Sequence, residues 1–196
     1  MDAEKDFELK DAKVILEPLT LGHVESLNAA AADGNLWNLT YTIIPCGDGM
    51  RTYVQKALDA KKLGTQIPFA ILNATTHRVI GSTRFWNIDN ANRKLEIGYT
   101  WIGKSYQGTH INLHAKYLML EHAFDNMQYI RVEFFTHENN KQSRGALEKI
   151  GAVYEGTLRN HMILPGGEYR NSACYSIIAS EWPEVKKRLQ DQMDCD

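Results

Sequence analysis

The sequence predicts an α/β protein that folds as one domain, and three observations support this. Strand-like and helix-like patterns alternate along its 196 residues. Apolar residues make up 43% of the chain, which suits one domain with a full core at this length. Finally, residues 95–102 alternate as a β-strand does, and residues 112–127 repeat at helical spacing. This strand, a turn and this helix form the central unit of the predicted fold.

Within the central unit, the side chains of the strand are expected to divide between two faces. Leu95, Ile97, Tyr99 and Trp101 are expected on one face, with Glu96 on the other. The helix carries an apolar stripe wide enough to pack on a sheet. Its members are Leu113, Tyr117, Leu120, Phe124 and Met127.

The remaining elements follow from apolar periodicity and from turn residues. Residues 1–12 offer little apolar surface and are expected to be flexible and solvated, ahead of a domain at 13–190 and a tail at 191–196. Before the central unit we expect a strand at 14–19, a helix at 20–32, a loop at 36–50, a helix at 50–62, and a hairpin of strands at 67–71 and 79–86. After it we expect a strand at 130–136, a helix at 139–151, a strand pair at 152–161 and 169–180, and a last helix from Ser180.

Composition excludes several classes of protein. The formal net charge of −2 argues against nucleic-acid binding through bulk charge. There is no run of about 18 apolar residues for a membrane span and no signal-peptide pattern at the start, so a cytoplasmic location is expected. Cys46, Cys174 and Cys195 lack Cys-x-x-Cys spacing, so we expect reduced thiols and no metal site.

The turn at residues 107–112 is a candidate anion site. It leads into the N-terminus of the central helix, where backbone amides have no intrahelical partner and the helix dipole is positive. A phosphate or pyrophosphate would suit such a turn. The alternative is a plain connection between a strand and a core helix, which needs no ligand.

The turn resembles the acetyl-CoA signature of the GCN5-related N-acetyltransferases (GNAT family), in its RimJ/RimL-like branch. Gln107, Gly108, Thr109 and Asn112 match the branch pattern Gln-Gly-Thr-x-x-Asn, while His110 stands where glycine is usual. The resemblance implies the GNAT fold, a single mixed, mostly antiparallel and splayed sheet with helices on both faces. It also implies contacts to acetyl-CoA from residues 107–112, Ile111 included, and from the end of the preceding strand at Thr100, Trp101 and Ile102.

A second motif lies at residues 139–151. Its family pattern, Asn-x-x-Ser/Ala and then a helix ending in Glu-Lys-x-Gly, is matched by Asn140, Ser143, Glu148, Lys149 and Gly151. Asn140 can also be understood as a helix cap and Gly151 as a left-handed stop. The resemblance adds that Asn140 would contact the pantetheine arm of the cofactor. The string at residues 155–159 again resembles the RimJ/RimL-like branch.

The implied acetyl transfer needs a neutral amine, a polarised thioester carbonyl and a proton for the departing thiolate. An α-amine, with a pKa of about 8, is easier to neutralise than a lysine. The family polarises the carbonyl with a strand amide, here that of Tyr99, Thr100 or Trp101. Many members use a tyrosine as the acid where this chain has Leu147. The resemblance to the RimL-type branch implies that Ser143 takes this role at the coenzyme A sulfur; the alternative is that Ser143 is an ordinary residue of the first helical turn.

Three residues are candidates for the general base. Glu96 lies on the central strand, Glu133 on the next strand, and His161 near the expected acceptor side, with an unperturbed pKa of about 6.5. Glu96 is slightly favoured. Each has a structural alternative, because a strand carboxylate often pairs with arginine or lysine, and a lone histidine usually lies on the surface or in a satisfied core.

The acceptor is expected to be a protein N-terminus. Trp37 and Tyr41 are candidates for its walls, although they could equally be aromatic cover for the core. Two alternatives stay open: a small-molecule amine such as a polyamine, amino acid or drug, and a non-catalytic module that binds coenzyme A. A homodimer is expected by analogy with the branch.

Overall fold

The protein contains one eight-stranded sheet with the strand order β1-β2-β3-β4-β5-β6-β8-β7. The computed structural model describes residues 6–164 and 166–194. The only parallel pair among these residues is β5 with β6, so the predicted mixed, mostly antiparallel sheet is confirmed. The strands are β1 (Leu9–Lys10), β2 (Val14–Pro18), β3 (Gln66–Asn73), β4 (Val79–Asp89), β5 (Lys94–Ile102), β6 (Arg131–His137), β7 (Val153–Ile163) and β8 (Tyr169–Ile178).

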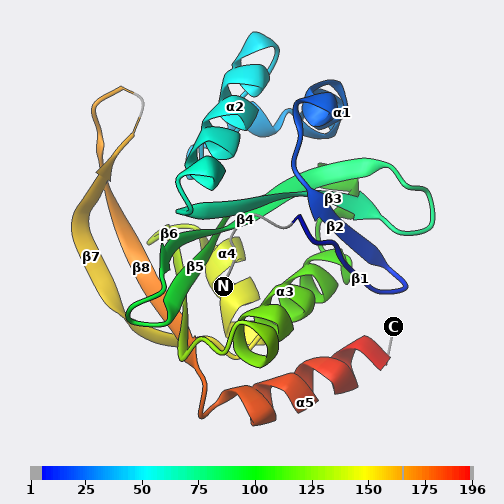
Figure 1. Ribbon diagram of the computed structural model, residues 1–196. Helices are drawn as coiled ribbons and strands as arrows, with labels where there is room; N and C mark the ends of the chain where they lie inside the picture. Colours follow the sequence, from blue (N-terminus) through cyan, green and yellow to red (C-terminus); the bar gives the residue numbers. More distant parts are fainter. Residues whose placement is uncertain (1–5, 165, 195–196) are drawn as a thin grey trace.

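Helices cover both faces of this sheet (Figure 1). The α-helices are α1 (Val24–Ala32), α2 (Asp48–Lys62), α3 (Ile111–Glu121), α4 (Lys141–Lys149) and α5 (Trp182–Asp194). The short helical turns are η1 (Leu21–His23), η2 (Leu36–Asn38), η3 (Lys104–Tyr106) and the π-helical η4 (His122–Asn126). α1 and α2 lie on one side of the sheet, and α3 and α5 lie on the other (Figure 1).

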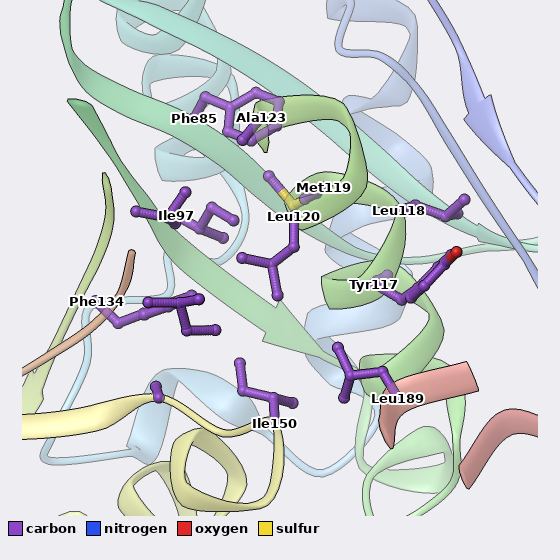
Figure 2. Close-up of a cluster of buried hydrophobic side chains, with 14 of the residues drawn as sticks. Phe85, Ile97, Tyr117, Leu118, Met119, Leu120, Ala123, Phe134, Ile150 and Leu189 are labelled. Carbon is purple, nitrogen blue, oxygen red and sulfur yellow. The ribbon is translucent and has the colours of Figure 1, made fainter. Parts of the chain in front are cut away.

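The sheet separates two hydrophobic clusters because its strands alternate. Phe69 and Ile71 of β3 face the α3 side, while Ala70 and Leu72 face the α1 and α2 side. On the α3 side, Leu120 lies among side chains from the sheet and from α5 (Figure 2). We call the other side, covered by α1 and α2, the α2 side.

The predicted alternation along β5 is wrong beyond Gly98. Tyr99 has a φ of 50°, and the register between β4 and β5 shifts between the pairs Arg84↔Gly98 and Ser82↔Trp101. This bulge reverses the faces, so Trp101 packs in the α2-side cluster and not with Leu95.

The ordered fold also extends beyond its predicted limits of 13 and 190. Phe7 packs against the Phe69 ring at 5.5 Å between centroids, and β1 pairs with β2. At the other end, Met193 of α5 packs on the core. Cys46 and Cys174 are free thiols, whereas Cys195 lies outside the described residues.

Candidate functional site

The candidate site forms where the central sheet divides. β5 and β6 pair over three positions, and the last of these joins Glu96 to Glu133. Beyond that pair, within residues 6–164 and 166–194, β5 has register partners on β4 alone. We call this divergence of residues 97–102 from residues 134–137 the fork. In this part of β5, the backbone amides that face β6 have no strand partner, so they can donate hydrogen bonds to a ligand.

Glu96 lies at the base of the fork on the α2 side of the sheet. It is 2% exposed, and Asn87 Nδ2 donates to its Oε2 across 3.3 Å. Burial is the main cause that raises the pKa of Glu96 to about 8, and the nearby Glu133 carboxylate raises it further, while Arg170 opposes the shift. A carboxyl group with this pKa can exchange a proton near neutral pH.

Gly98 allows side chains to approach the strand closely beside Glu96. A Cβ at this position would lie 2.6 Å from Trp86 Nε1 and 3.2 Å from Glu96 Oε1. Any larger residue would push the tryptophan ring or the carboxyl group away. The sequence therefore needs glycine here for packing, independently of any ligand.

Glu133 belongs to an ion-paired group. Its Oε1 accepts from Arg131 Nε across 2.7 Å, and the same guanidinium bonds both carboxylate oxygens of Glu155. The bond from Arg131 is the main cause that lowers the pKa of Glu155 to about 2. Glu133 thus has the structural role expected of a strand carboxylate, and Glu96 is the better candidate base.

His161, the third candidate base, lies beside the same cluster. Its ring packs on Phe135 at 5.1 Å between centroids, two residues beyond Glu133 on the same face of β6. Burial lowers the pKa of His161, and the positive charge of Arg170 lowers it further. Because Arg170 also acts on Glu96, the tertiary structure brings His161, Arg170 and Glu96 together.

The two aromatic wall candidates differ in position. The Tyr41 ring lies 4.9 Å from the His137 ring at the end of β6, so it reaches the fork. Trp37, in η2, is similarly exposed but makes no ring contact among the described residues. The structure therefore supports Tyr41 more strongly than Trp37 as a wall residue.

Arg84 is a buried charge on the strand next to that of the candidate base. It is 3% exposed, and its guanidinium carbon lies 4.8 Å from the Tyr53 ring centroid and 4.4 Å from that of Tyr99. Gln66 Oε1 accepts from Nη1 across 2.9 Å. In residues 6–164 and 166–194, no hydrogen-bond acceptor reaches Arg84 Nε or Nη2.

Lys116 of α3 places a second buried cation at the fork, on the opposite side of the sheet. Its Nζ donates to Thr100 Oγ1 across 2.8 Å and lies 5.8 Å from the Phe134 ring centroid. These two contacts come from β5 and β6, so the ammonium lies between the diverging strands. Burial lowers the pKa of Lys116 to about 7.

The turn before α3 has the backbone expected of an anion site. Gly108 has a φ of 76°, with no atom within 4 Å of the position of an added Cβ. His110 has a φ of −74°, so the residue that replaces glycine needs no left-handed conformation. Thr109, His110 and Ile111 line a hollow of about 440 Å³. Gln107 is not among the residues that line this hollow. Its Nε2 donates to the carbonyl of Ile102, at the end of β5, across 2.8 Å.

The second motif lies close to this turn. Asn140 caps α4, and its side chain accepts from the backbone amide of Ser143 across 3.0 Å. Gln142 Nε2 donates to Gln107 Oε1 across 3.4 Å, which joins the start of α4 to the turn. Gly151 has a φ of 89° and ends the helix region as predicted.

Comparison with known proteins identifies the family to which this fold and site belong. Residues 13–153 match the family model described as an acetyltransferase (GNAT) domain. The chain belongs to the GNAT family. Among the GNAT relatives, a Bacillus subtilis protein named as a ribosomal N-acetyltransferase, YdaF, is 33% identical over 106 residues. That alignment covers 54% of this chain and 57% of YdaF, so the chain spans little more than half of that relative.

Solved GNAT structures match over a longer range. An acetyltransferase structure from T. thermophilus is 32% identical with a TM-score of 0.83, covering 94% of this chain and 96% of that one. A GCN5-related N-acetyltransferase from Brucella melitensis is 28% identical with a TM-score of 0.85, covering 96% and 86%. The expected GNAT fold is confirmed by these likenesses.

The residues present fit a coenzyme A ligand as the GNAT family would hold it. The open Gly108 backbone and the amides at the start of α3 suit a pyrophosphate. The unpaired strand amides of the fork suit an extended chain with amide groups. Among the described residues there is no group of three or more His, Cys, Asp or Glu side chains that could hold a metal, and no helix long and apolar enough to cross a membrane.

Three charged residues of the site were not predicted from the sequence: Arg84, Lys116 and Arg170. The signal for the first two was present, because Arg84 lies inside the strand predicted at 79–86 and Lys116 lies between apolar residues in the helix stripe. A charge at a position predicted to be buried points to a partner or a function. Arg170 gives no such signal, because it follows an exposed turn.

Proposed function

We propose that the protein is an acetyl-CoA-dependent N-acetyltransferase whose acceptor is a primary amine, foremost the α-amino group of a protein N-terminus. The observation that carries this proposal is Glu96, a buried carboxyl group at the base of the fork with a pKa raised to about 8. Membership of the GNAT family supports the donor, and the value near 8 matches the pKa of an α-amine.

In this proposal acetyl-CoA supplies the thioester, and the chain supplies positioning and proton transfer. Glu96 takes a proton from the amine, directly or through a water, as the nitrogen attacks the carbonyl. An amide of the fork, at Tyr99 or Thr100, donates to the carbonyl oxygen as negative charge develops. Ser143, beside the Asn140 cap, donates to the departing sulfur. Direct attack needs no covalent enzyme intermediate.

The charges near Glu96 support an α-amine over a polyamine. A polyamine site would present several unpaired carboxylates to a multiply charged ligand. Here Glu133 and Glu155 share Arg131, while Arg84 and Arg170 are cations. The name of YdaF as a ribosomal N-acetyltransferase supports a protein substrate.

The non-catalytic alternative has less support. His110 adopts a negative φ, so its side chain imposes no backbone strain on the turn. Leu147, at the position of the family tyrosine, is buried in the core. Loss of that tyrosine leaves Ser143 and the buried Lys116 as groups that can donate a proton near the fork.

The decisive experiment is mass spectrometry of a mixed acceptor panel incubated with the protein and acetyl-CoA. The panel contains short peptides with different first residues, the same peptides with blocked α-amines and an internal lysine, polyamines and amino acids. Acetylated α-amines with unmodified lysines are the expected result. Acetylation confined to polyamines would overturn the proposed acceptor, and measurable acetyl-CoA binding with no product would overturn the proposed activity.

A further inference from the structure

The starting observation is that Arg84 is buried with two of its donor atoms unused. A buried guanidinium normally pairs with a carboxylate, because loss of its hydration is costly. Among the described residues Arg84 has one hydrogen bond, to the neutral Gln66, and its Nε and Nη2 have none. The two flanking tyrosine rings attract the charge but accept no hydrogen bond through their faces.

A second guanidinium, that of Arg170, interacts electrostatically with the same part of the molecule. Arg170 of β8 acts electrostatically on Tyr99, as Arg84 and Glu96 do, so these three groups lie within electrostatic range of the Tyr99 side chain. The Nε of Arg170 is buried and likewise has no acceptor in the part of the chain that the structure describes. Tyr99 is 43% exposed, so this cluster reaches the surface of the molecule.

The local charge balance favours an anion. Glu96 is mainly protonated at neutral pH because its pKa is about 8. Glu133 and Glu155 share Arg131, which offsets one of their two negative charges. Arg84, Arg131 and Arg170 therefore outnumber the ionised carboxylates Glu133 and Glu155, so the group keeps a net positive charge close to the candidate base.

Gly98 brings Arg84 and the candidate base close together. It is the register partner of Arg84 on the neighbouring strand. The Glu96 carboxyl lies over the same residue, since a Cβ at Gly98 would be 3.2 Å from Glu96 Oε1. An acceptor whose amine meets Glu96 would thus have its next substituents beside the guanidinium groups.

We infer that Arg84 and Arg170 bind a carboxylate of the acceptor, so that the protein selects amines with an acidic group close to the reacting nitrogen. This inference rests on the proposed function for the identity of the acceptor side. Guanidinium groups suit a planar carboxylate because they can donate two parallel hydrogen bonds. The carboxylate has two possible sources, an acidic side chain near a peptide N-terminus or the α-carboxylate of a free amino acid.

The test is titration calorimetry at about pH 7 in the presence of coenzyme A, with C-terminally amidated tetrapeptides in matched pairs. The pairs place Asp against Asn, and Glu against Gln, at the first or second residue. Alanine against alaninamide tests the free amino acid. Wild-type protein should bind the acidic member of at least one pair about tenfold more tightly, as expected of a charged hydrogen bond.

Variants then assign the preference to residues. In Arg84→Met and Arg170→Met the ratio of the two affinities should fall to about twofold or less. Arg84→Lys keeps the charge but loses the planar set of donors, so it should retain part of the preference. Arg78→Met, in the β3–β4 hairpin, is the matched control and should keep the wild-type ratio. Equal affinities in every pair for wild-type protein would overturn the inference, even if a variant failed to fold.

Acetyl transfer to the same ligands separates this inference from the proposed function. Carboxylate-dependent binding without acetyl transfer would overturn the function and support the binding site. Efficient transfer to peptides without any acidic preference would support the function and overturn the binding site.

Discussion

The Lys116 ammonium donates a hydrogen bond to the Thr100 hydroxyl across 2.8 Å in the interior of the protein. Thr100 Oγ1 in turn lies 2.7 Å from Thr83 Oγ1, so a polar chain joins α3, β5 and β4 beneath the sheet. Thr100 directly follows Tyr99, where the strand bulges. These hydrogen bonds therefore stabilise the bulge that shapes the fork, although they come at the cost of burying an amine.

Lys116→Met tests this cost. The folded-state pKa of about 7 lies below the ordinary 10.5, so the unfolded chain binds more protons between these values and wild-type stability rises with pH across this window. Methionine removes that dependence. The melting temperature of the variant relative to wild type should therefore be highest at about pH 7 and decrease towards pH 10.

Lys141→Met, on the exposed part of α4, is the control and should show no such trend. Amide hydrogen exchange at residues 98–101 should quicken in Lys116→Met, since the bulge loses its brace. A stability difference that does not vary with pH would contradict the lowered pKa of Lys116.

Glu96→Gln tests the proposed base. With a pKa of about 8, the wild-type carboxylate forms as pH rises, so kcat/KM should increase through about pH 8 and level off above it. The variant should lack this pH dependence, and its kcat should be about 10²-fold lower. Initial rates against pH check both, and Glu184→Gln on the surface of α5 is the matched control.

Thermal unfolding of Glu96→Gln provides an independent measurement. Because the folded pKa of Glu96 lies above its ordinary 4.5, the folded state binds the extra proton and wild-type stability falls as pH rises from about 4.5 to 8. Glutamine stays neutral, so the variant should gain stability relative to wild type across that window. An activity loss without this change in pH dependence would indicate displaced packing around Trp86.

Asn140 has a structural and a proposed functional role that two substitutions can separate. Asn140→Ala should cost about 1 kcal/mol of stability through loss of the cap on α4. Asn140→Ser keeps a capping oxygen and should restore most of that stability. If the amide also contacts the cofactor, both variants should bind acetyl-CoA more weakly in a calorimetric titration, and unchanged affinity in both would show a cap alone.

His110→Gly restores the residue usual in the family turn. Since His110 already has a φ of −74°, glycine relieves no strain and adds freedom to the unfolded chain. We expect a loss of about 0.5–1 kcal/mol in stability and no gain in acetyl-CoA affinity. A clear gain in affinity, measured by the same titration, would show that the imidazole obstructs the ligand.

Local patterns were sufficient for most of the fold. Asn140 caps its helix and Gly151 ends it, because capping depends on residues three or four positions apart. The alternation of Leu95 and Ile97 is correct for the same reason. It fails at Tyr99, because a bulge depends on the register with β4, which belongs to a strand that the local pattern does not include.

The sequence by itself determined the order of most strands and helices, the turn before α3 and the helix cap at Asn140, since each is encoded by neighbouring residues. Only the tertiary structure distinguishes the environments of Glu96 and Glu133. Glu96 and Glu133 look alike in sequence, yet Arg131 pairs with Glu133, while burial raises the pKa of Glu96. Burial and ion pairing depend on side chains that meet only after the chain has folded, and this also explains why Arg84, Arg170 and Lys116 emerged as functional candidates in the structure alone.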